Sequence, residues 1–207
     1  MIQTLDGMRR DLSLLADFVD ARARVLDVGC GDGTLLAYLR DRKGVDARGM
    51  ELSMDGVRDC VAQGLSVVQG DADTDLKDYP ENAFDVVILS QTLQATRAPD
   101  AVLKNLARIG RSAIVSFPNF GHWRALLHLA FKGRMPVTPT IPLEWYETPN
   151  IHFCTIRDFL ALVDKLELAI VDAAILDADG ARLGLDARGC AANLLGAQAI
   201  FKLARKS

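Results

Sequence analysis

Cysteine and histidine are scarce in this chain, and neither forms a pattern that a metal site or a redox pair requires. The 207 residues include four cysteines and three histidines, at Cys30, Cys60, Cys154, Cys190, His122, His128 and His152. No two cysteines make a Cys-x-x-Cys pair, and the histidines lack the spacing of metal ligands. We therefore expect no metal site, and the scattered cysteines favour reduced thiols in a cytoplasmic protein.

Long apolar runs and clusters of positive charge are missing as well. No apolar run approaches the length that spans a membrane. Residues 1–20 form an amphipathic helical pattern with acidic residues throughout, unlike a signal peptide. Lysine and arginine number 24 against 27 aspartate and glutamate, which gives a formal net charge of −3 without a basic stripe. We expect neither a membrane nor a nucleic acid as a partner.

Apolar residues make up half of the chain, which is enough for a full hydrophobic core. A length of 207 residues suits one such core and would be short for two. We therefore expect a single domain over residues 1–207.

A glycine-rich turn is the most informative segment. An apolar strand beginning at Arg24 breaks into glycines at alternate positions before a helical pattern begins, and these are Gly29, Gly31 and Gly33. The dinucleotide fingerprint GxGxxG would need a glycine at position 34, where this chain has Thr34. The spacing GxGxG therefore favours a different nucleotide cofactor, although a bare glycine trio is also compatible with a simple tight turn.

The charge beside this turn narrows the choice of cofactor. Asp27 lies two residues before the first glycine, and its carboxylate suits a ligand ammonium but would repel a pyrophosphate. Backbone amides of the glycine turn at a helix N-terminus suit a carboxylate. An ammonium and a carboxylate together are the amino-acid end of S-adenosylmethionine or S-adenosylhomocysteine, and Cys30 lies within the same turn.

Acidic residues at the ends of the next strands extend the predicted site. Glu51 follows Gly31 by 20 residues, the spacing that places an acid against the two hydroxyls of a ribose. Asp71 follows a third strand and suits the adenine amine, although acids in this stretch also suit plain turn chemistry. The predicted cofactor-binding residues are Asp27, Gly29, Cys30, Gly31, Gly33, Glu51, Leu52, Asp71, Ala72 and Gln91.

The order of predicted elements indicates an α/β fold with a doubly wound, mostly parallel sheet of seven strands. Strands alternate with helices over most of the chain, and the last two strands form a C-terminal antiparallel hairpin. The strands after the first cover 47–51, 66–69, 84–90, 112–117, 168–175 and 198–203, and the main helices cover 34–42, 99–109, 121–132 and 155–165. A ligand of such a sheet binds outside the carboxyl ends of its strands.

Several strings of unusual composition carry a family resemblance. They are LSQTLQ at 89–94, SFPNFGHWR at 116–124, GRMPVT at 133–138, EWY at 144–146, TPNIH at 148–152 and CTIRDF at 154–159. With the glycine turn, they make the chain resemble the MetW family of methionine-biosynthesis proteins, within the class I S-adenosylmethionine-dependent methyltransferases, over nearly its whole length. The chain departs from the family pattern at Ser53 and over 176–192.

The resemblance implies a pathway, methionine biosynthesis, more firmly than a reaction. MetW-like proteins are associated with homoserine O-acyltransferase, an acetyl- or succinyltransferase, which in some bacteria needs them for full activity. The resemblance therefore implies a heteromeric complex with this enzyme. A separate hypothesis, motivated by a cofactor site without an obvious base, is that bound S-adenosylmethionine, the pathway's downstream product, reports its level to the acyltransferase. The alternative is a methyltransferase acting on a small-molecule acceptor.

A catalytic base for methyl transfer is not evident from the residues. His122, after the fifth strand, is the best candidate, since histidine titrates near pH 6.5, but it could equally open a helix and bond locally. His152 could face the cleft or fix its loop. The residues thus leave open whether the protein is an enzyme.

An insertion rich in proline and aromatic residues covers about 119–154. Only about 23 residues precede the first strand, so any lid over the sheet has to come from this insertion. Its aromatic and arginine side chains suit a protein interface, an apolar substrate pocket, or packing on the edge of the sheet.

Overall fold

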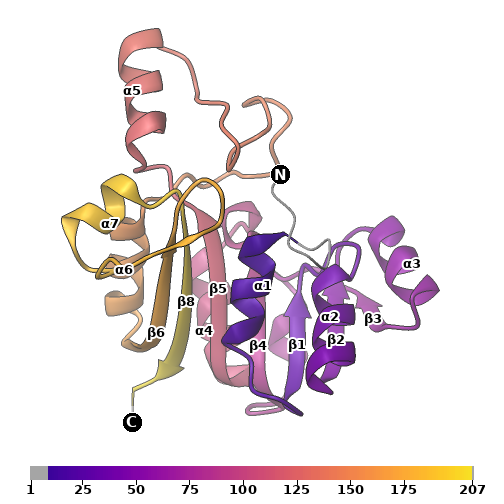
Figure 1. The fold of residues 1–207 in the computed structure, drawn as a ribbon. Helices are drawn as coiled ribbons and strands as arrows, with labels where there is room; N and C mark the ends of the chain where they lie inside the picture. The colour runs from indigo at the N-terminus through magenta and orange to yellow at the C-terminus, as the bar shows by residue number, and fades with distance from the viewer. Residues whose placement is uncertain (1–8, 207) are drawn as a thin grey trace.

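The computed structural model describes residues 9–206, and in them one eight-stranded sheet carries helices on both faces (Figure 1). The strands are β1 Arg24–Val28, β2 Asp46–Glu51, β3 Ser66–Gln69, β4 Phe84–Ser90, β5 Gly110–Pro118, β6 Leu168–Leu176, β7 Arg182–Leu183 and β8 Gln198–Arg205. The α-helices are α1 Arg10–Asp17, α2 Thr34–Lys43, α3 Met54–Ala62, α4 Pro99–Ile109, α5 Trp123–Lys132, α6 Ile156–Lys165 and α7 Cys190–Leu195, with single 3-10 turns at η1 Leu76–Asp78 and η2 Leu93–Ala95.

The strand order is β3-β2-β1-β4-β5-β8-β6-β7, which confirms the predicted doubly wound sheet. Strands β1 to β5 pair in parallel, and β8 pairs antiparallel with both β5 and β6. The order reverses between β1 and β4, so the loops after these two strands part and leave room for a ligand. The count of eight exceeds the predicted seven because the two-residue strand β7 pairs with the end of β6.

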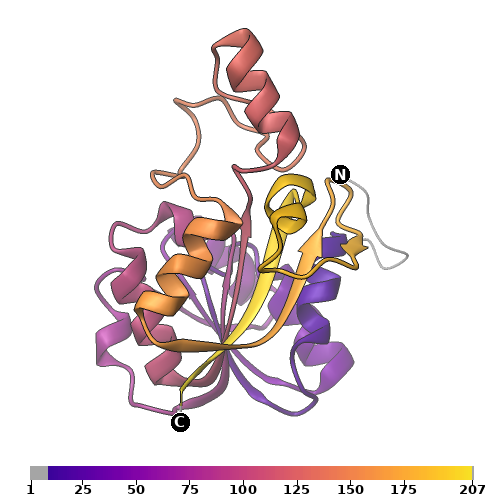
Figure 2. The same ribbon diagram turned by 90° about the vertical axis from the view of Figure 1, so that its left-hand side faces the viewer.

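Two apolar layers hold the helices to the sheet. On one face α1 and α2 pack on the central strands, and on the other face α4 and α6 do so (Figure 2). Parallel strands covered on both faces read as continuous apolar runs, and β4 has that character. Phe117, Phe159 and Phe201 pack together under α6, with ring centroids 4.7–6.1 Å apart.

Local signals set several helix ends where the sequence predicts them. Pro99 occupies the first turn of α4, where its missing amide hydrogen costs nothing. Thr155 and Asp158 form a capping box at the start of α6. The N-terminal helix covers Arg10–Asp17, shorter than the amphipathic pattern over 1–20, of which residues 1–8 lie outside the described residues.

Elements between the predicted ones differ from the simple alternation of strands and helices. The alternation of strands and helices predicts a helix between β2 and β3 without giving its bounds, and α3 occupies that place. Only the 3-10 turn η1 joins β3 to β4, since the acidic stretch there forms turns through its own carboxylates. The glycine-rich stretch after β6 contains β7 and α7.

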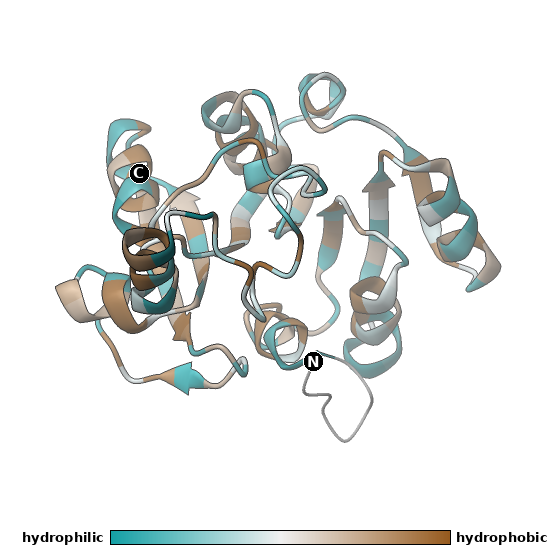
Figure 3. Cartoon of the chain, turned by 90° about the horizontal axis from the view of Figure 1, so that it is seen from above, coloured by the Kyte–Doolittle hydropathy of each residue, from teal (hydrophilic) through white to brown (hydrophobic). Residues whose placement is uncertain are grey.

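Residues 123–153, here called the arm, rise from the carboxyl edge of the sheet (Figures 1 and 2). The arm consists of α5 and the irregular segment that returns to α6, and viewed from above much of α5 is hydrophobic (Figure 3). Its base is held by Gln94, whose carbonyl accepts from the amides of Ile151 and His152. Eleven of the eighteen exposed large hydrophobic residues of the described chain belong to the arm: Trp123, Leu126, Leu127, Leu129, Phe131, Val137, Leu143, Trp145, Tyr146, Ile151 and Phe153.

Among the described residues, no helix combines the length and the apolar character that crossing a bilayer requires.

Candidate functional site

A cleft of about 340 Å³ opens at the carboxyl ends of β1 and β4, where the strand order reverses. Its size falls within the range of small-molecule sites. Its lining comes from the glycine turn, the tip of β4 and the N-terminal helix: Arg9, Leu12, Asp27, Gly29, Cys30, Gly31, Asp32, Thr34, Leu35, Ser90 and Gln91.

The glycine turn has a backbone that only glycine adopts readily. Gly29, Gly31 and Gly33 have φ angles of 73°, 57° and 79°. A Cβ on Gly29 would lie 2.5 Å from Oγ1 of Thr92, so this glycine allows the turn to pack against the chain after β4. A Cβ on Gly31 would meet no described atom within 4 Å, so the space above this residue is open to a ligand.

Asp27 lies at the floor of the cleft with its carboxyl almost fully buried. The residue is 2% exposed, and Oδ1 has no hydrogen-bond partner among the described residues. Burial and the nearby charge of Glu51 raise the pKa of Asp27 from 3.8 to about 7. A buried carboxyl without a partner costs free energy of folding, so a cationic ligand group at this place would be strongly favoured.

Glu51 connects the second strand to the glycine turn. Its Oε2 accepts from the amide of Gly31 at 2.8 Å, and its Oε1 accepts from the amide of Ser53 at 2.8 Å. Each carboxylate oxygen keeps a second lone pair for a further donor. The next residue, Leu52, is 64% exposed and offers an apolar surface beside this carboxylate.

The acidic stretch after β3 is tied into its own loop. Oδ1 of Asp71 accepts from the amide of Asp73 at 2.9 Å, and Oδ2 lies 3.6 Å from the guanidinium of Arg97. Ala72 packs against the core on the α4 side. Asp73 accepts from the amides of Arg97 and Ala98 and so fixes the entry into α4. These bonds match the turn chemistry that the sequence left open beside an adenine contact.

The N-terminal helix forms a wall of the cleft, which the sequence did not predict. Gln91 has a φ of 55° and donates from Nε2 to Oδ2 of Asp11 at 2.9 Å. The guanidinium of Arg9 donates to the same carboxylate at 3.0 Å. The expectation that only the insertion could cover the sheet is therefore wrong, because Arg9 and Leu12 line the cleft. The hydrogen bond between Gln91 and Asp11 joins residues 80 positions apart, so no local sequence pattern predicts it.

The structure brings half of the predicted cofactor residues into the cleft lining and leaves the others beside it. Asp27, Gly29, Cys30, Gly31 and Gln91 line the cleft. Glu51 contacts the lining residue Gly31, and the other four predicted residues are not among the described residues that line the cleft: Gly33, Leu52, Asp71 and Ala72.

Neither candidate catalytic histidine is among the described residues that line this cleft. His122 is the residue before α5, is buried, and lines a separate pocket at the foot of the arm. His152 is exposed on the returning segment, with Nε2 3.4 Å from the carbonyl oxygen of Arg97. The side chains at the tip of β4, Ser90 and Gln91, are neutral.

Comparison with known families gives a match over nearly the whole chain. The model described as "Methionine biosynthesis protein MetW" matches residues 9–203. A bifunctional methionine biosynthesis protein MetXA/MetW of Rhodopirellula baltica is 33% identical over 178 residues, which cover 82% of this chain and 29% of that protein. The chain therefore spans less than a third of this relative.

Methyltransferases are similar at greater distance. Ajmaline N-methyltransferase of Rauvolfia serpentina is 22% identical over 158 residues, covering 72% of this chain and 53% of that protein. The structure of an S-adenosylmethionine-dependent methyltransferase from Mesorhizobium loti aligns with a TM-score of 0.70 at 16% identity, covering 98% of this chain and all of that chain. Similarity at this level establishes the fold, which is the methyltransferase fold that the sequence predicted.

Proposed function

Because the chain belongs to the MetW family of methionine biosynthesis proteins, we propose that it binds S-adenosylmethionine or S-adenosylhomocysteine and activates homoserine O-acyltransferase in a heteromeric complex. The first half of this proposal concerns the cleft, and the second half concerns the arm.

The unpartnered oxygen of Asp27 carries the ligand half of the proposal. A buried carboxyl whose Oδ1 has no partner among residues 9–206 lacks the hydrogen bond that buried polar atoms normally have. The α-ammonium of the ligand would supply that bond and a compensating charge. The open space above Gly31 would admit the ligand carboxylate to the amides of the glycine turn.

The nucleoside end of the ligand would lie along the β2 and β3 side of the turn. Glu51 would accept from the ribose hydroxyls with the lone pairs that Gly31 and Ser53 leave free. Leu52 would cover one face of the adenine with its exposed side chain. Asp71, beside Ala72, is the proposed acceptor for the adenine amine.

S-adenosylmethionine, when bound, supplies an electrophilic methyl group. Using it would require the protein to position an acceptor and often to remove a proton from it. The cleft offers the neutral side chains of Ser90 and Gln91 at the tip of β4, and neither candidate histidine is among the described residues of its lining. This arrangement favours a ligand that is bound and sensed. The second candidate, methyl transfer to a small molecule, is supported by the similarity to the Rauvolfia N-methyltransferase.

The exposed apolar side chains of the arm support the partner half of the proposal. Phe131, Trp145 and Tyr146 are 84%, 68% and 67% exposed. At those exposures they present roughly 400 Å² together, about half of what one partner buries in a standard interface. An apolar surface of this extent on a folded protein is often functional. The Rhodopirellula relative, whose name joins MetXA to MetW in one chain, supports the same association.

Two binding experiments test the proposal separately. Calorimetry with S-adenosylhomocysteine should give saturable one-to-one binding. If no binding were measured, the proposal that the cleft binds this ligand would be wrong. Size-exclusion chromatography with the cognate homoserine O-acyltransferase should show co-elution that is lost when Phe131 and Trp145 are both changed to Ser. If these changes left co-elution intact, the interface would lie outside these arm residues. If the wild-type proteins did not co-elute, the proposed complex would be wrong.

A further inference from the structure

A second pocket, of about 430 Å³, lies at the foot of the arm between the start of α5 and the loop that follows β6. None of the described residues lines both this pocket and the glycine-turn cleft. It is the larger of the two, and it lies within the size range of small-molecule sites. The proposed function makes no use of it.

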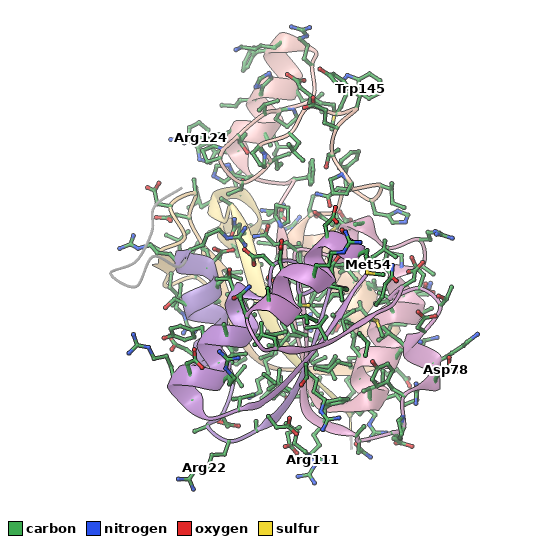
Figure 4. The ribbon with its side chains drawn as sticks, turned by 90° about the vertical axis from the view of Figure 1, so that its right-hand side faces the viewer. Arg22, Met54, Asp78, Arg111, Arg124 and Trp145 are labelled. Carbon is green, nitrogen blue, oxygen red and sulfur yellow. The ribbon has the colours of Figure 1, made fainter. Side chains whose placement is uncertain are left out.

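One wall of the pocket suits a negatively charged group. Trp123 and Arg124 line it from the first turn of α5, where the backbone amides have no acceptor within the helix. The guanidinium of Arg124 lies 5.2 Å from the ring centroid of Trp123, a cation–π contact between two residues of the pocket lining. Figure 4 labels Arg124 at the foot of the arm. A helix N-terminus with an arginine beside it is a favourable place for a carboxylate.

His122 gives a second and independent indication of a ligand. The residue is only 9% exposed, it lines the pocket, and its imidazole makes no hydrogen bond with any described residue. Its one ring contact is with Trp123, at 5.8 Å between centroids. Burial and the charge of Arg124 lower the pKa of His122, so the ring is neutral near pH 7. A neutral imidazole with both nitrogens unused can donate to one ligand atom and accept from another.

The opposite wall carries the complementary charge and an apolar floor. Asp177 and Asp179 line the pocket from the loop after β6, and Asp177 uses Oδ1 for the amides of Asp179 and Ala181, which leaves Oδ2 free. Leu183, Leu185 and Leu195 contribute apolar surface to the same pocket. Because two carboxylates line one wall and an arginine lines the other, a ligand that carries only a positive or only a negative charge would be repelled by one of the walls.

We propose that this pocket binds an α-amino acid with a short apolar side chain. The ligand carboxylate meets Arg124 and the first turn of α5, the ammonium meets Asp177 and Asp179, and the side chain lies against the leucines. The imidazole of His122, whose nitrogens have no partner among the described residues, supplies a further polar contact for the ligand.

L-leucine is the probe, titrated calorimetrically into the full chain saturated with S-adenosylhomocysteine. Binding in the millimolar range or tighter is expected, because a zwitterion makes two charge-assisted contacts here. Two truncated probes, isoamylamine without the carboxylate and 4-methylpentanoate without the ammonium, should each bind at least tenfold more weakly. Arg124→Gln and Asp179→Asn should each lower the L-leucine affinity about tenfold or more, and both residues are exposed enough for the variants to fold.

Arg134→Gln, an exposed arginine of the arm outside the pocket lining, is the matched control and should leave the affinity unchanged. Absence of L-leucine binding up to about 10 mM would overturn the proposal. So would binding that Arg124→Gln and Asp179→Asn leave intact, or binding that is lost in Asp27→Asn, because the probe would then occupy the glycine-turn cleft.

Discussion

The amide of Gly31 donates to Oε2 of Glu51 over 2.8 Å, so the glycine turn and the acid 20 residues later are in direct contact. The bond holds Gly31 in its left-handed conformation at the mouth of the cleft. Glu51 therefore has two parts to its role, because it shapes the turn and faces the ribose in the proposed complex.

Replacing Glu51 with Ala should weaken binding of S-adenosylhomocysteine by about 1–3 kcal/mol, roughly ten- to hundredfold. The side chain is only partly buried, so the domain should remain folded. Glu51→Gln keeps an acceptor for one amide but loses the charge. Its affinity for S-adenosylhomocysteine should therefore lie between those of the wild type and Glu51→Ala. Calorimetry on the three proteins measures this, and equal affinities would take Glu51 away from the ribose.

Gly31→Ala should reduce ligand affinity far more than it reduces stability. The new methyl group meets no described atom within 4 Å, so the folding cost is the backbone strain of a positive φ, about 1–2 kcal/mol. Gly44 is a matched control, because it has a φ of 62° and equally open surroundings but lies at the end of α2. Gly31→Ala and Gly44→Ala should unfold at similar denaturant concentrations, whereas only Gly31→Ala should lose affinity. If both variants lost ligand affinity to the same extent, the loss would come from backbone strain and not from a blocked approach of the ligand to Gly31.

Asp27 should make the free protein less stable as the pH rises from about 4 to about 7. Its pKa is about 7 in the folded state and 3.8 ordinarily, so the folded state binds more protons than the unfolded state over this range. The full penalty, on the order of 4 kcal/mol, is present above pH 7. Denaturant unfolding at several pH values should show this decline in the wild type and a flatter profile in Asp27→Asn. Identical profiles would mean that Asp27 titrates normally.

Ligand binding should reverse that behaviour of Asp27. An ammonium beside the carboxyl favours its charged form, so binding below pH 7 must release a proton from Asp27. Affinity for S-adenosylhomocysteine should therefore rise by up to tenfold per pH unit towards pH 7 and then level off. Asp27→Asn should bind at least tenfold more weakly and without this slope. A pH-independent affinity in the wild type would contradict contact between Asp27 and the ammonium.

The sequence was sufficient to predict the fold, because the fold depends largely on local signals. Continuous apolar strands, Pro99 at the start of α4 and the capping box at Thr155 each act over a few residues. The glycine turn and Asp27, which a local pattern also singles out, line the cleft that we propose as the ligand site.

The wall formed by α1 could not be predicted in this way. It depends on the bond between Gln91 and Asp11, which joins residues 80 positions apart and leaves no periodic pattern in either segment. The placement of His122 away from the cleft likewise depends on the direction in which α5 leaves the sheet after β5. The close approach of Gly56 in α3 to Glu51, where a Cβ would lie 2.9 Å from Cγ of the glutamate, is also a contact that no local pattern indicates.

The arm should be needed for the partner and not for the fold. Changing both Phe131 and Trp145 to Ser removes side chains that are 84% and 68% exposed, so the unfolding free energy should change by less than about 1 kcal/mol. Activation of homoserine O-acyltransferase should fall at least tenfold at a fixed subsaturating concentration. Val171→Ser, on strand β6 and 58% exposed, is the matched apolar control and should activate normally. Full activation by the double variant would exclude these arm residues from the interface.

The most direct test is the rate of the cognate homoserine O-acyltransferase with and without an equimolar amount of this protein, each with and without S-adenosylmethionine. The account predicts a higher rate when the protein is present and a further change when the ligand is added. That second change should disappear in Asp27→Asn. An acyltransferase rate that is the same in all four conditions would contradict the account and favour methyl transfer to a small molecule.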